Sequence, residues 1–128
     1  MAFFDNFTVF NFDEGVPYVS VTKNGVTFNK AVIMKLDYPA HVCLLINNDE
    51  KQIAIQACHS NEPNSVKFFK PKKDPRILSV RWNSKDLLNT IESMMHWDLE
   101  HIAYRIDGIL IKEENAMLFD LKYAKELS

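Results

Sequence analysis

The dipeptide Asn24-Gly25 constrains the fold of this chain more than any other feature of its sequence. It separates two short runs, 18–22 and 26–28, in which Tyr, Val or Phe alternates with Ser or Thr. A two-residue type I′ turn needs residues that accept a positive φ at both central positions, and Asn-Gly meets that need well. The sequence therefore predicts an antiparallel β-hairpin near its start.

Apolar spacing downstream predicts two helices and further short strands. Asn29 is well placed to cap a short helix over 31–36, and the apolar residues of 84–97 recur at helical spacing, which predicts one long helix. Asp107-Gly108 marks a second tight turn. The expected strands are 42–46, 52–57, 77–82, 101–106, 109–112 and 116–121.

The two halves of the chain resemble each other. Segment 26–30 aligns with 80–84, and 41–46 aligns with 101–106, in each case around a predicted helix. Such a unit cannot bury its sheet face alone, so two copies would share one core. Internal duplication and chance similarity both remain open as explanations.

We therefore predict a single domain over 1–128. Two pseudo-repeated β-α-β-β units, at about 18–58 and about 77–121, are joined by a proline-containing linker at about 59–76. The expected fold class is α+β. It has a largely antiparallel sheet, with a swapped-hairpin or barrel-like form as one option, and the long helix 84–97 packed on one face.

Composition limits the environment. The longest unbroken apolar run, Val42 to Ile46, is far shorter than the ~20 residues that cross a bilayer. The segment before Phe12 has no basic residue and lacks the features of a secretory signal. We expect a cytoplasmic chain with no membrane contact, in which the only cysteines, Cys43 and Cys58, stay reduced.

Landmarks between Tyr18 and Ala57 follow the layout of a known family. A strand reaches a turn glycine at Gly25, a helix starts at Asn29 and ends at Leu36, and a hairpin with alternating apolar residues follows. This stretch resembles the AbrB/SpoVT family of swapped-hairpin transcription factors and antitoxins. The resemblance implies a small DNA-binding regulator that forms a homodimer. The whole chain is also similar to a group of small bacterial proteins, a likeness that implies no activity.

Three positions depart from the family pattern. Val26 stands where the family has a basic residue after the turn glycine, Asn29 where a proline opens the helix, and Asp37 where a glycine closes it. These departures bear on the residues that would contact DNA.

Charge is divided along the chain. Segment 59–83 has six basic and two acidic residues, whereas 84–128 has five basic and nine acidic ones. Phosphate contacts require such basic residues, and Phe68 or Phe69 could stack on a base. A plain solvated connection is the alternative for the linker. The candidate nucleic-acid-binding residues are Lys23, Lys30, Lys67, Lys70, Lys72, Lys73 and Arg76.

Metal binding and catalysis are less favoured. A tight hairpin over 42–57 brings His41, Cys43, Cys58 and His59 near one another, which is a zinc-capable set, although adjacent Cys58 and His59 point to opposite faces. Two half-buried thiols are the alternative. The sequence has no catalytic motif, so we expect neither an enzyme nor a cofactor.

A second functional hypothesis is a protein-interaction or small-ligand-binding module without nucleic-acid binding. Its surface would combine the aromatic N-terminal segment with any open edge of the sheet. That segment, 1–20, carries five Phe and three acids but no Lys or Arg. DNA binding and protein interaction therefore predict different surfaces.

Overall fold

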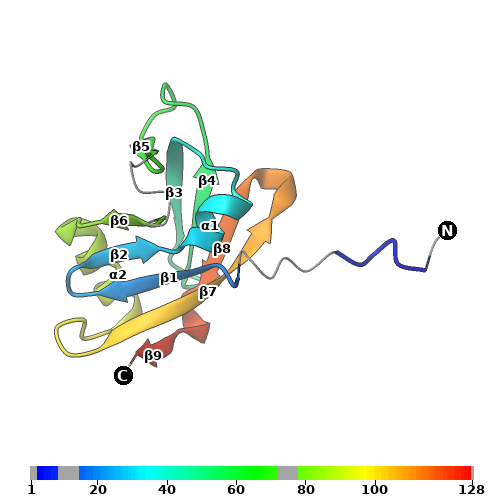
Figure 1. The fold of residues 1–128 in the computed structure, drawn as a ribbon. Helices are drawn as coiled ribbons and strands as arrows, with labels where there is room; N and C mark the ends of the chain where they lie inside the picture. The colour runs from blue at the N-terminus through cyan, green and yellow to red at the C-terminus, as the bar shows by residue number, and fades with distance from the viewer. Residues whose placement is uncertain (1–2, 9–14, 72–77, 128) are drawn as a thin grey trace.

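The fold is a curled, almost wholly antiparallel sheet (Figure 1). A computed structural model describes residues 3–8, 15–71 and 78–127 of the protein. Its strands run in the order β5-β3-β4-β8-β7-β1-β2-β6, and β9 pairs with β7. The strands are β1 (Tyr18–Thr22), β2 (Gly25–Phe28), β3 (His41–Asn47), β4 (Gln52–Ala57), β5 (Val66–Lys67), β6 (Val80–Trp82), β7 (Ala103–Ile111), β8 (Ala116–Asp120) and β9 (Lys125–Leu127).

The predicted hairpin is confirmed, but the prediction of a type I′ turn centred on Asn24-Gly25 was wrong, because the two turn residues are Lys23 and Asn24 and neither has a positive φ. β1 and β2 pair in antiparallel register, with Thr22 opposite Gly25. Gly25 adopts φ 148°, and a Cβ on it would lie 2.6 Å from the carbonyl oxygen of Trp82. Only glycine fits here, because the backbone of β6, which pairs with β2, lies too close to leave room for a side chain.

Two short α-helices join the strands. Helix α1 (Lys30–Lys35) begins after Asn29, whose side chain accepts from the Val32 amide, as the sequence predicts. Helix α2 (Lys85–Met95) begins after Ser84, whose hydroxyl accepts from the Leu87 amide. Two single 3₁₀ turns, η1 (Lys112–Glu114) and η2 (Leu121–Tyr123), flank β8.

The prediction of an α+β fold with a long helix over 84–97 was wrong. Helix α2 has eleven residues, because His96 takes the left-handed conformation at φ 57° and ends it. Helix α1 has only six. Sheet pairing dominates the described residues, and the helices cover only part of the curled sheet.

The prediction of a tight turn at Asp107-Gly108 was also wrong. β7 runs through both residues as one nine-residue strand and changes partner there. Asp107 pairs with Tyr18 of β1, whereas Gly108 pairs with Phe119 of β8. A Gly in a strand allows a neighbour to approach closely, and here Phe119 and Met117 take the space of a side chain.

Strands from the two predicted units interleave in one sheet rather than forming separate layers. β2 pairs with β6, with Thr27 opposite Arg81, and β4 pairs with β8. β1 lies between β2 and β7. The internal repeat itself stays a prediction.

The buried apolar side chains form one hydrophobic core. The Phe28 ring packs against three other aromatic rings in this core, at centroid distances of 5.4 Å to Phe68, 5.0 Å to Trp82 and 5.8 Å to Phe119. Ile33 of α1 and Ile91 of α2 are fully buried against it. Since Phe28, Trp82 and Phe119 come from different strands, this cluster joins both halves of the sheet.

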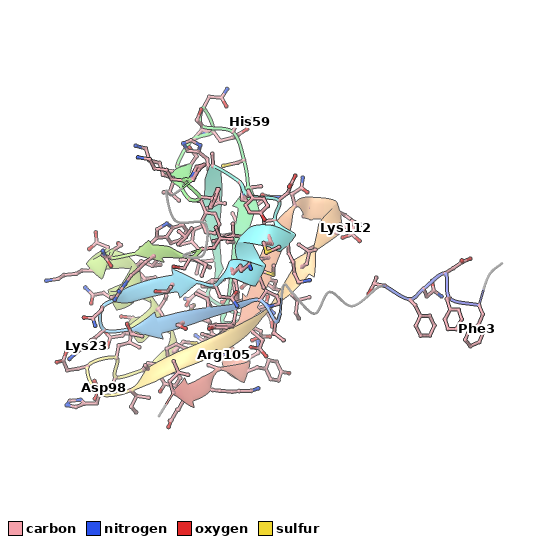
Figure 2. All side chains as sticks on the ribbon, viewed as in Figure 1. Phe3, Lys23, His59, Asp98, Arg105 and Lys112 are labelled. Carbon is pink, nitrogen blue, oxygen red and sulfur yellow. The ribbon has the colours of Figure 1, made fainter. Side chains whose placement is uncertain are left out.

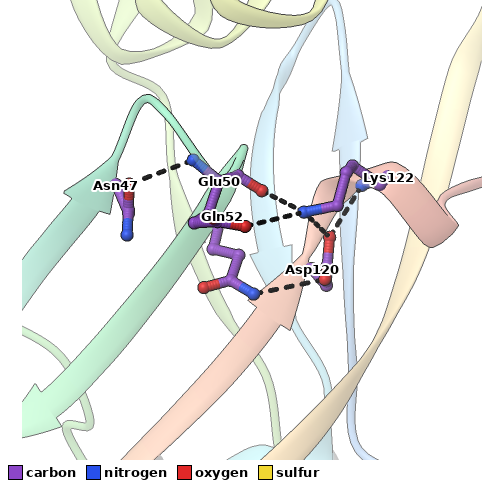
Figure 3. A network of polar contacts seen from close by, with 5 residues as sticks. All are labelled: Asn47, Glu50, Gln52, Asp120 and Lys122. Carbon is purple, nitrogen blue, oxygen red and sulfur yellow. Dashed lines mark hydrogen bonds and ion pairs between the residues drawn. The ribbon is translucent and has the colours of Figure 1, made fainter.

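A polar network joins the start of β4 to the end of β8 (Figure 3). The Asp120 carboxylate accepts from Gln52 Nε2 at 3.2 Å and from the Lys122 amide at 3.1 Å. Lys122 Nζ lies 3.3 Å from Asp120 and donates to the Glu50 carbonyl. The Glu50 amide donates to Asn47, which closes the β3–β4 turn.

Candidate functional site

The two ends of the sheet approach each other without pairing. β5 and β6 are the terminal strands of the order, and between them the Trp82 indole Nε1 donates to the Lys67 carbonyl at 3.3 Å. Beside this bond lies a cleft of about 470 Å³. We call it the seam cleft; it is lined by Leu44, Val66, Lys67, Arg81, Trp82, Asn83, Ser84 and Leu87.

Unpaired strand edges border the seam cleft. Over the described residues, β5 pairs only with His41 and Val42, so the rest of that edge of β3 has no neighbouring strand. Among the described strands, β6 pairs with β2 alone, on one side. Exposed strand edges of this kind present backbone N–H and C=O groups to an incoming chain.

The cleft combines an apolar floor with two cations. Leu44 and Leu87 are half-buried, and Val66 is 41% exposed. Lys67 and Arg81 are both exposed on its rim. Lys67 was a candidate from the sequence, as a nucleic-acid-binding residue, whereas Arg81 was not, because its closeness to Lys67 depends on contacts between strands far apart in the chain.

A second hollow of about 520 Å³ continues along the same strand and helix. It is lined by Ile46, two residues beyond Leu44 on β3, and by Asn89, Thr90, Ser93 and Met94 of α2. Ile46 is 43% exposed. Residues of β3 and α2 therefore line two hollows, the seam cleft and this one.

Of the basic residues expected to bind nucleic acid, the four that the structure describes do not gather in one place. Lys23 lies in the β1–β2 turn and lines a shallow hollow with Lys85, Glu92 and Glu100, so its surroundings are of mixed charge. Lys30 begins α1, at the other end of β2. Lys67 and Lys70 lie in and after β5. Lys72, Lys73 and Arg76 lie outside the described residues.

The two aromatic residues of the linker, Phe68 and Phe69, already pack against other rings of the protein. Phe68 is 7% exposed and packs edge-on against Phe28 and Trp82. Phe69 is half-buried and lies 5.4 Å from the ring of Tyr38. Phe68 therefore has no ring face available for stacking on a base.

The structure brings together two of the four residues suggested as metal ligands. The Sγ atoms of Cys43 and Cys58 lie 3.2 Å apart, whereas His59 is exposed and His41 lies opposite Cys58 at the strand end. Burial raises the pKa of the Cys58 thiol to about 11, with contributions from the hydrogen bond to Cys43 and from the Glu62 charge. Within the described ranges, no three His, Cys, Asp or Glu side chains form a metal-binding group.

The N-terminal aromatic segment makes a cluster of its own. Phe3, Phe4 and Phe7 are 82%, 68% and 63% exposed, and their ring centroids lie 4.8 to 6.2 Å apart. Figures 1 and 2 show this segment extending away from the sheet, with Phe3 at its far end. Such a group of exposed aromatic rings is unusual on an isolated chain.

No helix within the described residues has the length and apolar character that a membrane span requires. Compared with known proteins, the chain matches no family model, no curated protein and no solved structure.

Proposed function

We propose that this chain is a non-enzymatic protein-interaction module whose seam cleft binds an extended, acidic and phenylalanine-rich segment. The observation that carries the proposal is the incomplete closure of the sheet, with an apolar cleft between the unpaired edges of β3 and β6. A peptide can add to such an edge as a further strand, so that its main chain supplies affinity and its alternate side chains fill pockets.

Charge and shape define the occupant. Lys67 and Arg81 on the rim favour carboxylates, and Leu44, Val66 and Leu87 favour apolar side chains. The chain's own segment 1–14 has this chemistry, with five Phe, three acids and no basic side chain. We therefore take the N-terminal segment of a second copy as the occupant, which makes the interaction homotypic.

Binding of a labelled peptide tests this function directly. A fluorescent peptide with the sequence of residues 1–14 is titrated with the full chain, and anisotropy is measured. We expect saturable binding that weakens roughly tenfold in the double variant Lys67→Glu/Arg81→Glu, because both rim charges are reversed.

A matched control distinguishes an effect of the cleft on peptide binding from an effect of the protein's net charge. Lys112→Glu/Lys125→Glu makes the same change of net charge on exposed lysines of η1 and β9, away from the cleft, and should bind the peptide as the wild type does. A peptide with every Phe replaced by Ser should not bind. Equal loss in the two double variants, or no binding at millimolar peptide, would refute the proposal.

Nucleic-acid binding is the second candidate, supported by the six basic residues of segment 59–83. The same full chain is titrated with a mixed-sequence DNA duplex at low salt and near physiological salt. Binding that falls steeply with salt would support phosphate contacts. Peptide binding without duplex binding would leave the interaction module as the function.

A further inference from the structure

The thiols of Cys43 and Cys58 lie on one face of the β3–β4 hairpin at its open end. Cys43 pairs with Gln56 across the hairpin, and the Cys58 amide donates to the His41 carbonyl at 3.1 Å. Cys58 is therefore the diagonal neighbour of Cys43 on adjacent strands. Diagonal neighbours share a face, since alternate residues of a strand point the same way.

The separation of the two sulfur atoms is close to bonding distance. Their Sγ atoms are 3.2 Å apart, and a disulfide bond is about 2.05 Å long. Small rotations about the two Cα–Cβ bonds can supply the difference, and the paired strands already hold the backbone.

A cavity makes both thiols accessible. A cavity of about 600 Å³ lies beside them, and Cys43 and Cys58 both line it with Asp37, Gln56, His59 and Glu62. Both cysteines are half-buried free thiols. A hydroperoxide or a small disulfide can therefore reach the sulfur atoms.

We propose that Cys43 and Cys58 form a reversible intramolecular disulfide when the chain meets a hydroperoxide. One thiolate attacks a peroxide oxygen, the O–O bond breaks, and a sulfenic acid forms as one molecule of water leaves. The second sulfur attacks the sulfenic sulfur, the S–S bond forms, and hydroxide leaves with the second thiol proton as water. Two thiols are oxidised by two electrons and hydrogen peroxide is reduced to two waters.

The cross-link fixes the start of the loop that leads to β5. Cys58 is the first residue after β4, and the chain from it reaches Val66 and Lys67 of the seam cleft. A bond from Cys58 to β3 therefore anchors this loop at its base. Because the bond also reduces the freedom of the unfolded chain, the oxidised protein should melt several degrees higher.

Oxidation of the dilute full chain tests the site. The protein is treated with hydrogen peroxide over several hours, because a thiol of raised pKa reacts slowly at neutral pH. It is then unfolded, alkylated with iodoacetamide and weighed by mass spectrometry. We expect a monomer that has lost two hydrogens, takes up no iodoacetamide and yields one peptide pair joined through Cys43 and Cys58.

Reduction and single variants provide the controls. Dithiothreitol should restore two alkylation sites and the original melting temperature. Cys43→Ser and Cys58→Ser should each take up one alkyl group and show no rise in melting temperature on oxidation. Wild-type protein that keeps both alkylation sites, forms only intermolecular dimers, or goes to sulfinic acid without a disulfide would overturn the proposal, whether or not either variant folds.

Discussion

Asp120 shows how one carboxylate is held by its neighbours. Its side chain is only 18% exposed and accepts from Gln52 and Lys122. Burial alone raises the pKa of this carboxyl, but these hydrogen bonds and the Lys122 charge together outweigh burial, so the pKa lies below its usual value. The ionised form is therefore favoured by the fold.

Replacing Asp120 by Asn should cost about 1 kcal/mol of unfolding free energy at pH 6, because Gln52 loses its acceptor. A carboxyl whose pKa is lowered in the folded state stabilises the protein above its unfolded pKa of about 3.9 and loses that effect as the pH falls through the folded pKa. The difference between wild type and Asp120→Asn should therefore shrink as the pH falls below about 4.

Urea unfolding at pH 6 and near pH 3 measures this difference. Glu113→Gln, an exposed acid of η1 for which we expect no such role, serves as the control and should change stability little at either pH. A deficit of Asp120→Asn that is the same at both pH values would contradict the lowered pKa.

At the scale of elements, β7 determines how the sheet curls. Its first half pairs with β1 on one side and β9 on the other, and its second half pairs with β8. Gly108 lies at the change of partner. A Cβ on it would come within 2.8 Å of the Phe119 ring and 2.9 Å of Met117, both of which are fully buried.

Gly108→Ala should destabilise the protein by about 2 kcal/mol, because the added methyl overpacks a filled core. Chemical denaturation measures the loss. Ile109→Ala alters the next residue of the strand, which is 59% exposed, and should stay within about 0.5 kcal/mol of the wild type. Equal effects of the two variants would mean that the space at Gly108 does not matter.

At the scale of the whole molecule, the sheet does not close into a barrel, because its terminal strands β5 and β6 do not pair over the described residues. We call the line between these two strands the seam. Over the described residues, one hydrogen bond between a side chain and a carbonyl, from Trp82 to Lys67, joins the terminal strands. The amide of Phe68, next to Lys67, donates to the Ala40 carbonyl at 2.8 Å and holds β5 against the chain before β3. Among the described residues, the seam therefore lacks the ladder of backbone hydrogen bonds that joins the paired strands.

Trp82→Phe should remove the indole donor while keeping an aromatic ring in the core. We expect a loss of about 1 kcal/mol and faster hydrogen exchange at the Phe68 amide, because β5 is then held on one side only. Trp97→Phe is the control, since the Trp97 ring stacks on Tyr104, 3.8 Å between centroids, and Trp97 is not among the residues that line the seam cleft. If exchange at Phe68 were equally fast in both variants, the bond to Lys67 would not hold the seam.

Local signals were predicted from the sequence because they act within a few residues. The β1–β2 hairpin and the Asn29 cap each depend on neighbours close in the chain, and the structure confirms both. The approach of Cys43 to Cys58 was also within reach, since a tight hairpin must bring its ends together.

Only the tertiary structure decided which strands become neighbours and where the sheet stays open. Asp107-Gly108 has the residues of a turn, yet partners on both sides keep β7 extended. Lys67 and Arg81 lie on one rim only because β5 and β6 meet after the sheet has curled. Apolar periodicity determines that a segment is a strand and which face it buries, but pairing partners depend on contacts between residues far apart in the chain.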